Sequence, residues 1–378
     1  MSEWMSFEAL LTEGYRQCAK LTWRYGTTYF WGAALLPKPQ RKHVHAIYAL
    51  CRLADDIVDL PNGHHLIRYD LNQVRPDPVE EHESSIGRKS ARPSHDPDSI
   101  PTEPEPTLPD PDPVRPGIDW RASEPSASSA RASVVRARLE AFADRFRTSL
   151  TEGGDTDPVM AAVVHTVITC GIPRDYFDRF FGAMAMDLTT TRYETWEDLR
   201  TYMEGSAAVI GEMMLPVLQP TSQAARPPAR SLGLAFQLTN FIRDVDEDLD
   251  RGRIYLPQDD LRLFDVDLEQ RQATPEWRAF LAYEIERNRA LYSFADTGIA
   301  MLPPRSARCV GTARVLYSQI LDEIERNGYD VFSQRARVPT ARKAATAARI
   351  MVTGPRSLKK QAELYQRGSM TDVAQDRH

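Results

Sequence analysis

The chain has 378 residues, of which 42% are hydrophobic and 26% charged, and its formal net charge is −6 at pH 7. This composition is that of an ordinary globular protein, and without a basic excess to neutralise phosphates no nucleic-acid partner is expected. No apolar run approaches the roughly 18 residues of a membrane span, and the amino terminus lacks the features of a signal peptide.

Helical periodicity runs through most of the chain, with few signs of strands. Apolar residues recur at spacings of three and four, which predicts amphipathic helices and an all-α protein. In chain order, helices are expected at residues 6–24, 40–59, 133–151, 157–171, 174–188, 196–219, 229–250, 276–301, 305–327 and 340–366. The four cysteines have neither metal-type spacing nor a paired framework, so we expect free thiols in a reducing cytosol.

Residues 61–133 break the helical pattern. The segment is dense in Pro, Asp, Glu, Ser and Arg, as in "PTEPEPTLPDPDPVRPG", and cannot bury enough apolar surface to offset the entropy of ordering. We expect a disordered insertion that loops out of one helical domain made of residues 1–60 and 134–366, followed by a tail at 367–378. Loop-closure entropy grows slowly with length, so the flanking helices can still pack together.

Two segments rich in aspartate carry the chemistry. In "YALCRLADDIVD", residues 48–59, a helical projection places Tyr48, Asp59 and Arg52 within about 60° of Asp55, away from the apolar side chains.

The second segment, "QLTNFIRDVDEDLDRGRIYLP" at residues 237–257, has an aspartate at every second position from 244 to 250. On a continuous helix, Asp244 and Asp248 share a face with Gln237 and Asn240. The two alternate aspartates point to the opposite side and are expected to be solvated.

A single pair of aspartates four residues apart is common on solvated faces. If both pairs line a cavity between helices, however, their buried charges need compensation. Mg²⁺, or Mn²⁺ in its place, could supply it together with a substrate diphosphate. A calcium loop in "DVDEDLDRGRIY" is excluded, because Leu249 or Arg251 stands where the sharp-turn glycine belongs and no Glu closes the loop.

In these segments the chain resembles the squalene/phytoene synthase family of class I isoprenoid synthases, closest to its bacterial phytoene-type members. The stretches "TTYFWGAALLPKPQRKHVHAIYALCRLADDIVD" and "GLAFQLTNFIRDVDEDLDRGRIYLP" resemble its two signatures, and "MDLTTTRY" and "ILDEIERNGYDVF" resemble further landmarks. The family often has a serine-rich stretch where this chain has "YGTTYF". The resemblance covers nearly all of the chain outside the insertion and the last residues. It implies a single-domain helical bundle around a central active-site cavity, the isoprenoid synthase type I fold.

Carried over position by position, the resemblance assigns a role to each matching residue. The metal-binding residues would be Asp55, Asp59, Asn240, Asp244 and Asp248. The substrate-binding residues would be Tyr29, Arg52, Gln237, Arg243 and Arg192. The catalytic residues would be Tyr48, Arg52, Asp187 and Tyr255. Apolar helix sides would exclude water from the reaction, with the candidates Phe181, Met184, Met186, Val209, Met213, Met214, Leu234 and Phe236.

The resemblance implies a Mg²⁺-dependent prenyltransferase that condenses two geranylgeranyl diphosphates head to head, through prephytoene diphosphate, to phytoene in carotenoid biosynthesis. NADPH is not expected, because residues 355–378 lack the membrane anchor common in NADPH-using squalene synthases. Squalene or dehydrosqualene synthesis from farnesyl diphosphate is the first alternative. A head-to-tail prenyltransferase or terpene cyclase is another, since "DDIVD" fits their DDxxD pattern, and a non-catalytic assembly factor is the last.

Prenyl diphosphates are therefore the expected partners, and the cytoplasm is the expected compartment. Because the substrates are lipophilic, transient peripheral contact with a membrane is expected, and the basic stretch 342–360 is one candidate surface. The sequence leaves the oligomeric state and the substrate chain length open.

Overall fold

The computed structural model describes residues 6–59 and 127–353, and these residues fold into helices. The helices of the first half are α1 (Phe7–Tyr25), α2 (Thr27–Ala33), α3 (Lys38–Asp59), α4 (Ala127–Glu152), α5 (Pro158–Cys170), α6 (Arg174–Met186), α7 (Trp196–Met203) and α8 (Val209–Leu218). Those of the second half are α9 (Arg226–Arg243), α10 (Val245–Asp250), α11 (Gln258–Leu263), α12 (Pro275–Ile299), α13 (Pro304–Arg326) and α14 (Thr340–Thr353). The all-α prediction is confirmed.

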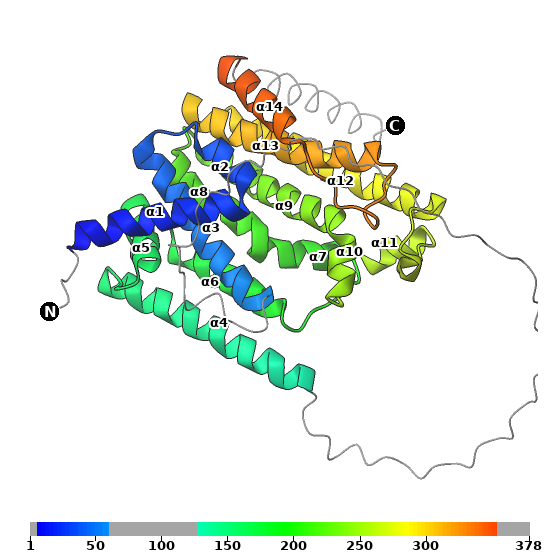
Figure 1. Cartoon of the computed structure of the whole chain (residues 1–378), viewed down its shortest axis with the longest axis horizontal. Coiled ribbons are helices and arrows are strands. Elements are labelled where there is room, and N and C mark those ends of the chain that lie inside the picture. Colours follow the sequence, from blue (N-terminus) through cyan, green and yellow to red (C-terminus); the bar gives the residue numbers. More distant parts are fainter. Residues whose placement is uncertain (1–5, 60–126, 354–378) are drawn as a thin grey trace, which may run out of the picture.

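The helices form a bundle in which α9 is central (Figure 1). Helix α9 packs against α8, α12 and α13, while α3 packs against α1 and α5. Buried apolar side chains form two main clusters, one drawn mainly from α1, α3, α4, α5, α6 and α8, the other mainly from α7, α9, α12 and α13. Helices α3 and α9, which carry the two aspartate-rich segments, therefore belong to different halves of the core.

Local signals in the sequence fix several helix ends. Helix α5 begins where the Asp157 side chain accepts a hydrogen bond from the Met160 N–H, and it ends at Gly171, whose φ of 64° is left-handed. Helix α7 begins with a capping box in which Thr195 and Asp198 bond each other's backbone N–H groups. Because such caps depend on neighbouring residues alone, they are readable from the sequence.

The amino-terminal boundary of α4 differs from the expectation. The sequence pattern places residues 127–133 in the insertion, but they form the first turns of α4, in keeping with the high helix propensity of alanine in "ASSARAS". Residues 60–126 and 354–378 lie outside the described residues, so the rest of the expected insertion, the end of the last predicted helix and the tail stay predictions.

Two predicted helices are interrupted. The one expected at 229–250 breaks at Asp244, whose φ of −105° and ψ of 17° end α9 and precede α10. The one expected at 196–219 contains a π-helical turn, Glu204–Ala208, between α7 and α8. Helices α2 and α11 were not predicted, because elements of 7 and 6 residues are too short to show a hydrophobic period.

A buried ion network ties α6, α8 and α9 together. Glu212 on α8 is 1% exposed, and its carboxylate accepts hydrogen bonds from Arg179 of α6 and from Arg226 and Arg230 of α9. The last two lie 2.6 and 3.1 Å from it. Three cations around one buried carboxylate offset the desolvation of its charge, and they fix the helices that form one wall of the cavity described below.

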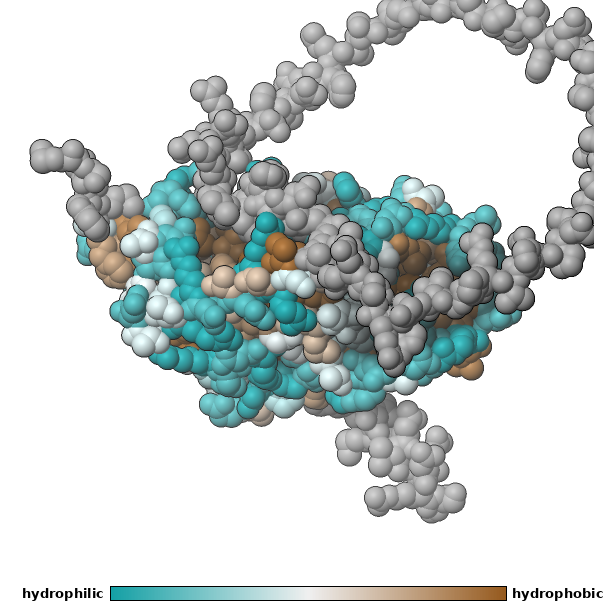
Figure 2. Space-filling view, turned by 90° about the horizontal axis from the view of Figure 1, so that it is seen from below, coloured by the Kyte–Doolittle hydropathy of each residue, from teal (hydrophilic) through white to brown (hydrophobic). Residues whose placement is uncertain are grey.

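The face shown in Figure 2 is largely hydrophilic, with hydrophobic residues gathered in a few places. No helix in the described part of the chain has the length and apolarity that a membrane span needs. The four cysteines are unpaired, and three of them are buried.

Candidate active site

A cavity of about 740 Å³ lies between α3 and α9, with further walls from α2, α8, α12 and α13. Its lining changes character along both main helices. On α9 the lining residues begin with Pro228 and end at Arg243, about 22 Å further along the helix. On α3 they run from Val44 to Asp59. The cavity therefore has an acidic end and an apolar remainder.

The first aspartate pair faces this cavity as predicted. The predicted residues of α3 all line it: Tyr48, Arg52, Asp55 and Asp59. Burial raises the pKa of Asp55 to about 8, and the negative charge of Asp59 adds to the shift while Arg52 opposes it. Arg52 also donates a hydrogen bond to Asp56, so the positive charge of Arg52 is shared between Asp55 and Asp56. The site thus holds carboxylate charge that its own cations compensate only in part.

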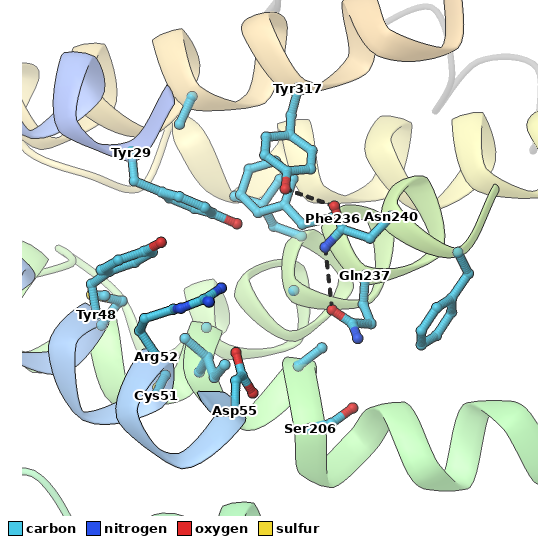
Figure 3. Close-up of a pocket in the computed structure, with 18 of the residues that line it drawn as sticks. Tyr29, Tyr48, Cys51, Arg52, Asp55, Ser206, Phe236, Gln237, Asn240 and Tyr317 are labelled. Atoms are coloured by element: carbon cyan, nitrogen blue, oxygen red, sulfur yellow. Dashed lines mark hydrogen bonds between the residues drawn. The ribbon is translucent and has the colours of Figure 1, made fainter. Parts of the chain in front are cut away.

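The second set comes from α9 and α10, and all of its predicted members line the cavity: Gln237, Asn240, Arg243, Asp244 and Asp248. The Asn240 Oδ1 accepts a hydrogen bond of 2.8 Å from the Tyr317 hydroxyl, and its amide lies 3.5 Å from the Gln237 Oε1 (Figure 3). Burial raises the pKa of Asp248 to about 7, with a further contribution from the charge of Asp244.

Asp244 is the most heavily paired of these acids. Arg243 donates two hydrogen bonds of 2.6 and 2.5 Å to its carboxylate, and Arg335 donates two more of 2.8 Å each. Burial acts to raise the pKa of Asp244, but the hydrogen bonds and charges of the two arginines lower it overall. Asp244 is therefore ionised and neutralised by the protein itself.

The two alternate aspartates of this segment lie elsewhere. Asp246 and Asp250 pair with Arg271 at 2.9 and 2.7 Å, and neither lines the cavity. Although the helix breaks at Asp244, the predicted division of the four aspartates into an inward and an outward pair is confirmed.

A third acid, Asp187, joins the two helices. The Tyr255 hydroxyl donates to its two carboxylate oxygens at 3.0 and 3.2 Å, and the Tyr255 ring stacks on Phe241 with centres 4.0 Å apart. Arg253 donates a hydrogen bond of 2.8 Å to Asp59 and lies 3.7 Å from Asp187. The segment after α10 thus links α3 to the carboxyl end of α6.

Four aromatic side chains gather above the acidic end. The ring centre of Tyr29 lies 5.7 Å from those of Tyr48, Phe236 and Tyr317, and Figure 3 shows Tyr29 and Tyr48 side by side over Arg52. Burial raises the pKa of Tyr29 well above its usual range and does the same for Tyr48. Both hydroxyls therefore stay protonated and can donate hydrogen bonds.

Arg192 is the one predicted site residue that the structure does not bring into the cavity. Its side chain is exposed and is not among the lining residues. The backbone of residues 191–192 forms an isolated parallel bridge with Ile254. Arg253, next to that bridge, supplies the cation beside Asp187 instead. The position of Arg253 two residues before Tyr255, in "GRIYLP", is the sequence signal that could have identified it as a site residue.

The apolar lining was predicted in part. Of the eight candidates, Met184, Met214 and Phe236 line the cavity. Met186 is exposed, and the remaining four are core residues outside the lining: Phe181, Val209, Met213 and Leu234.

Tyr25 and Tyr29 of the "YGTTYF" stretch line the cavity, but several other lining residues are not indicated by the sequence: Arg24, Tyr202, Arg251, Arg253, Tyr317 and Arg335. Arg335 lies 91 residues beyond Asp244 in the connection between α13 and α14. No local pattern could have paired residues so far apart.

The acidic end has the chemistry of a divalent-metal site. Carboxylates and an amide oxygen are the donors that Mg²⁺ prefers, and the raised pKa values of Asp55 and Asp248 show that the protein does not fully compensate their ionised forms. Within the described ranges, however, no three His, Cys, Asp or Glu side chains are gathered closely enough to hold a metal ion. The donors fit Mg²⁺ by type, but the arginines on Asp59 and Asp244 hold part of the set in other bonds.

Comparison with known proteins gives evidence that is independent of the geometry of the site. The sequence model of the squalene/phytoene synthase family matches residues 23–96 and 122–342. A phytoene synthase from Arthrospira platensis is 31% identical over 355 residues, which cover 90% of this chain and 93% of that protein. A 15-cis-phytoene synthase from Synechococcus elongatus is 31% identical, over 89% of this chain and 91% of its own.

Solved structures share the fold. The squalene synthase HpnC from Alicyclobacillus acidocaldarius superposes with a TM-score of 0.60 at 25% identity, over 86% of this chain and 97% of its own. A dehydrosqualene synthase in complex with ligand gives a TM-score of 0.65 at 21% identity, over 92% and 98% of the two chains.

Proposed function

The chain belongs to the squalene/phytoene synthase family, and we propose that it is a prenyltransferase that condenses two geranylgeranyl diphosphates head to head to phytoene. Relatives named phytoene synthase match about nine-tenths of the chain at 31% identity. The reaction class follows from the family, and the substrate length follows from these relatives.

The observation that carries the proposal is the polarity of the cavity. A prenyl diphosphate has a highly charged head and a long hydrocarbon tail. The cavity offers acids, arginines and tyrosines at one end of α3 and α9 and apolar side chains over the rest of their length. A metal-bound diphosphate at the acidic end would place its tail along the apolar walls.

We propose that Mg²⁺ is held between the two helices. Asp55 and Asp59 would bind it from α3, and Asn240, Asp244 and Asp248 from α9 and α10. Bound Mg²⁺ supplies Lewis-acid stabilisation of the leaving diphosphate. Mn²⁺ has the same preference for oxygen donors and is expected to substitute for it.

Protein side chains would position the same diphosphate. Arg52, Gln237 and Arg243 line the acidic end and can donate hydrogen bonds to phosphate oxygens. The protonated hydroxyls of Tyr29 and Tyr48 add two neutral donors. Tyr255 would act by holding the Asp187 carboxylate, through the pair of hydrogen bonds described above.

The chemistry consists of two ionisations. In the first, the allylic C–O bond of one substrate breaks, its carbon bonds to the first double bond of the other, and one proton leaves, giving prephytoene diphosphate and pyrophosphate. In the second, the remaining diphosphate leaves, the carbon skeleton rearranges and a further proton is lost to give phytoene. Apolar side chains such as Met184, Met214 and Phe236 keep water from capturing the cations.

Product analysis tests this function. The purified protein is incubated with Mg²⁺ and either farnesyl or geranylgeranyl diphosphate, with and without NADPH, and the hydrocarbon is identified by mass spectrometry. We expect phytoene from geranylgeranyl diphosphate without NADPH. A C30 product from farnesyl diphosphate alone would establish the alternative of squalene or dehydrosqualene synthesis. Head-to-tail or cyclised products would refute head-to-head condensation, and the absence of any product would favour a non-catalytic role.

Two variants test the metal ligands. Asp55→Ala and Asp244→Ala are expected to abolish turnover at saturating Mg²⁺ while the helical fold, followed by circular dichroism, is kept. Asp246→Ala is the matched control, because its carboxylate pairs with Arg271 outside the cavity, and it is expected to keep activity. Full activity of either inward-facing variant would remove that residue from the proposed metal set.

We also propose that the enzyme acts in the cytoplasm and touches membranes only transiently, since its product is a water-insoluble hydrocarbon. Co-sedimentation with phospholipid vesicles should then be weak and reversible. Recovery of the whole protein with the vesicles after a salt wash would contradict a transient contact.

A further inference from the structure

We propose that Arg243 and Arg335 keep Asp244 from binding metal in the substrate-free protein, and that an arriving diphosphate draws Arg335 away and thereby completes the metal site. This inference rests on the proposed function, because it takes Asp244 as a Mg²⁺ ligand. It adds a residue, Arg335, that would exchange one anionic partner for another and so make metal binding depend on the diphosphate.

The Asp244 carboxylate already accepts as many hydrogen bonds as it has positions for. Arg243 and Arg335 each donate two hydrogen bonds, and all four have lengths between 2.5 and 2.8 Å. An ionised carboxylate has about four lone-pair positions. Four donors therefore occupy the positions that a metal ion would need, and a cation can bind Asp244 only after at least one arginine has moved.

Arg335 is the arginine that can move. Arg243 is the residue next to Asp244 at the end of α9, and its side chain is 15% exposed. Arg335 comes from the connection between α13 and α14, and its side chain is 36% exposed. Beyond Asp244 it has one longer contact, 3.5 Å to Glu247. Moving it breaks an ion pair near the surface, whereas moving Arg243 would disturb a helix end in the core.

The wall beside Arg335 is ready to receive an anion. Arg335 lines the cavity, and Lys343 lies close enough to both Arg243 and Arg337 for their charges to act on it. Burial lowers the pKa of Lys343, and repulsion by Arg243 and Arg337 lowers it further. No acidic side chain of the described residues pairs with Arg337 or Lys343. A diphosphate would relieve this repulsion, and the planar guanidinium of Arg335 matches phosphate oxygens as well as it matches a carboxylate.

The other helix has a similar arrangement. Arg253 donates a 2.8 Å hydrogen bond to Asp59, and Asp248 has a longer contact of 3.5 Å with Arg251, so each aspartate pair has at least one member that is bound to an arginine. Metal and diphosphate are then linked: each makes the arginine–aspartate pairs easier to open for the other, and their binding is mutually reinforcing. An enzyme built this way binds metal weakly until its substrate arrives.

The first experiment measures Mn²⁺ binding to the substrate-free protein by electron paramagnetic resonance. Arg335→Gln is expected to bind Mn²⁺ about two- to fivefold more tightly than the wild type, the change that follows from losing one ion pair near the surface. Arg335→Lys keeps the charge but loses the bidentate geometry, so its Mn²⁺ affinity should lie between that of the wild type and that of Arg335→Gln. Arg271→Gln is the matched control, because Arg271 pairs with the outward aspartates, and its Mn²⁺ affinity should equal that of the wild type.

The second experiment measures binding of inorganic pyrophosphate in the presence of saturating Mg²⁺ by calorimetry. Here the same Arg335→Gln variant is expected to bind about tenfold more weakly, because a fork of donors to the diphosphate is missing. Opposite changes in the two affinities are the signature of exchange, since a merely structural disturbance would weaken both.

Unchanged or weaker Mn²⁺ binding by Arg335→Gln would overturn the inference. The Asp244→Asn variant separates this failure from that of the proposed function. If the wild type binds Mn²⁺ in the presence of pyrophosphate and Asp244→Asn does not, Asp244 is a ligand, and the Arg335 result alone decides the exchange. If the wild type binds no Mn²⁺ even with pyrophosphate, the metal site and the exchange are both refuted.

Discussion

Replacing Asp55 by Asn is expected to stabilise the metal-free protein while abolishing turnover. Asp55 faces the acidic end of the cavity, and its pKa is raised to about 8 by burial and by the charge of Asp59, with Arg52 acting in the opposite direction. The unfolded chain has no such surroundings. At neutral pH, therefore, folding must either bury a charge or bind a proton at this position.

The sign and size of the effect follow from this shift. A carboxyl group whose pKa is higher in the folded state destabilises the fold as the pH rises above its ordinary value of 3.8, and the loss is complete above about pH 8. Each pH unit between these values costs about 1.4 kcal/mol, which gives an upper limit of about 5 to 6 kcal/mol. Because the carboxylate faces an open cavity where water can relax this cost, we expect Asp55→Asn to stabilise the protein by about 1 to 3 kcal/mol at pH 8.

The assay is urea unfolding followed by circular dichroism, with EDTA present, at pH 5 and pH 8. The stability gain of Asp55→Asn should be several-fold larger at pH 8 than at pH 5. Asp246→Asn is the control, because its carboxylate pairs with Arg271 outside the cavity, and its effect should stay within about 0.5 kcal/mol at both pH values.

An Asp55→Asn protein that is no more stable than the wild type at pH 8 would refute this reasoning. So would a gain that does not grow with pH. Either result would mean that the carboxylate is fully compensated without metal, and the main electrostatic reason for expecting a cation at this position would be lost.

Three further substitutions test other parts of the structure. Glu212→Gln should lower the free energy of unfolding by about 3 kcal/mol, measured in urea, because it removes the buried negative charge that three arginines share. Tyr255→Phe should lower kcat about tenfold with little change in melting temperature, because the Asp187 carboxylate loses a donor at 3.0 Å; an equal loss of stability and activity would contradict a positioning role. Gly298→Ala should destabilise the fold by about 1 to 3 kcal/mol in thermal unfolding, because its new methyl group would lie 2.5 Å from the Pro228 Cβ.

The sequence by itself determined the helices and the faces of the two aspartate-rich segments. A helix repeats every 3.6 residues whatever surrounds it, so the inward positions of Asp55, Asp59, Asp244 and Asp248 could be calculated from local geometry. The break at Asp244 did not alter the outcome, because one irregular residue changes the direction of the short α10 without exchanging its two faces.

Only the tertiary structure decided which cations and hydroxyls meet these acids. Arg335 reaches Asp244 across 91 residues, and Arg253 reaches Asp59 across 194. Such pairings depend on how whole helices pack, which no local period encodes. Packing also decides the position of Arg192, whose exposed side chain lies outside the cavity lining. The carboxylates of the site can be predicted from the sequence pattern, but their partners are set by the tertiary fold.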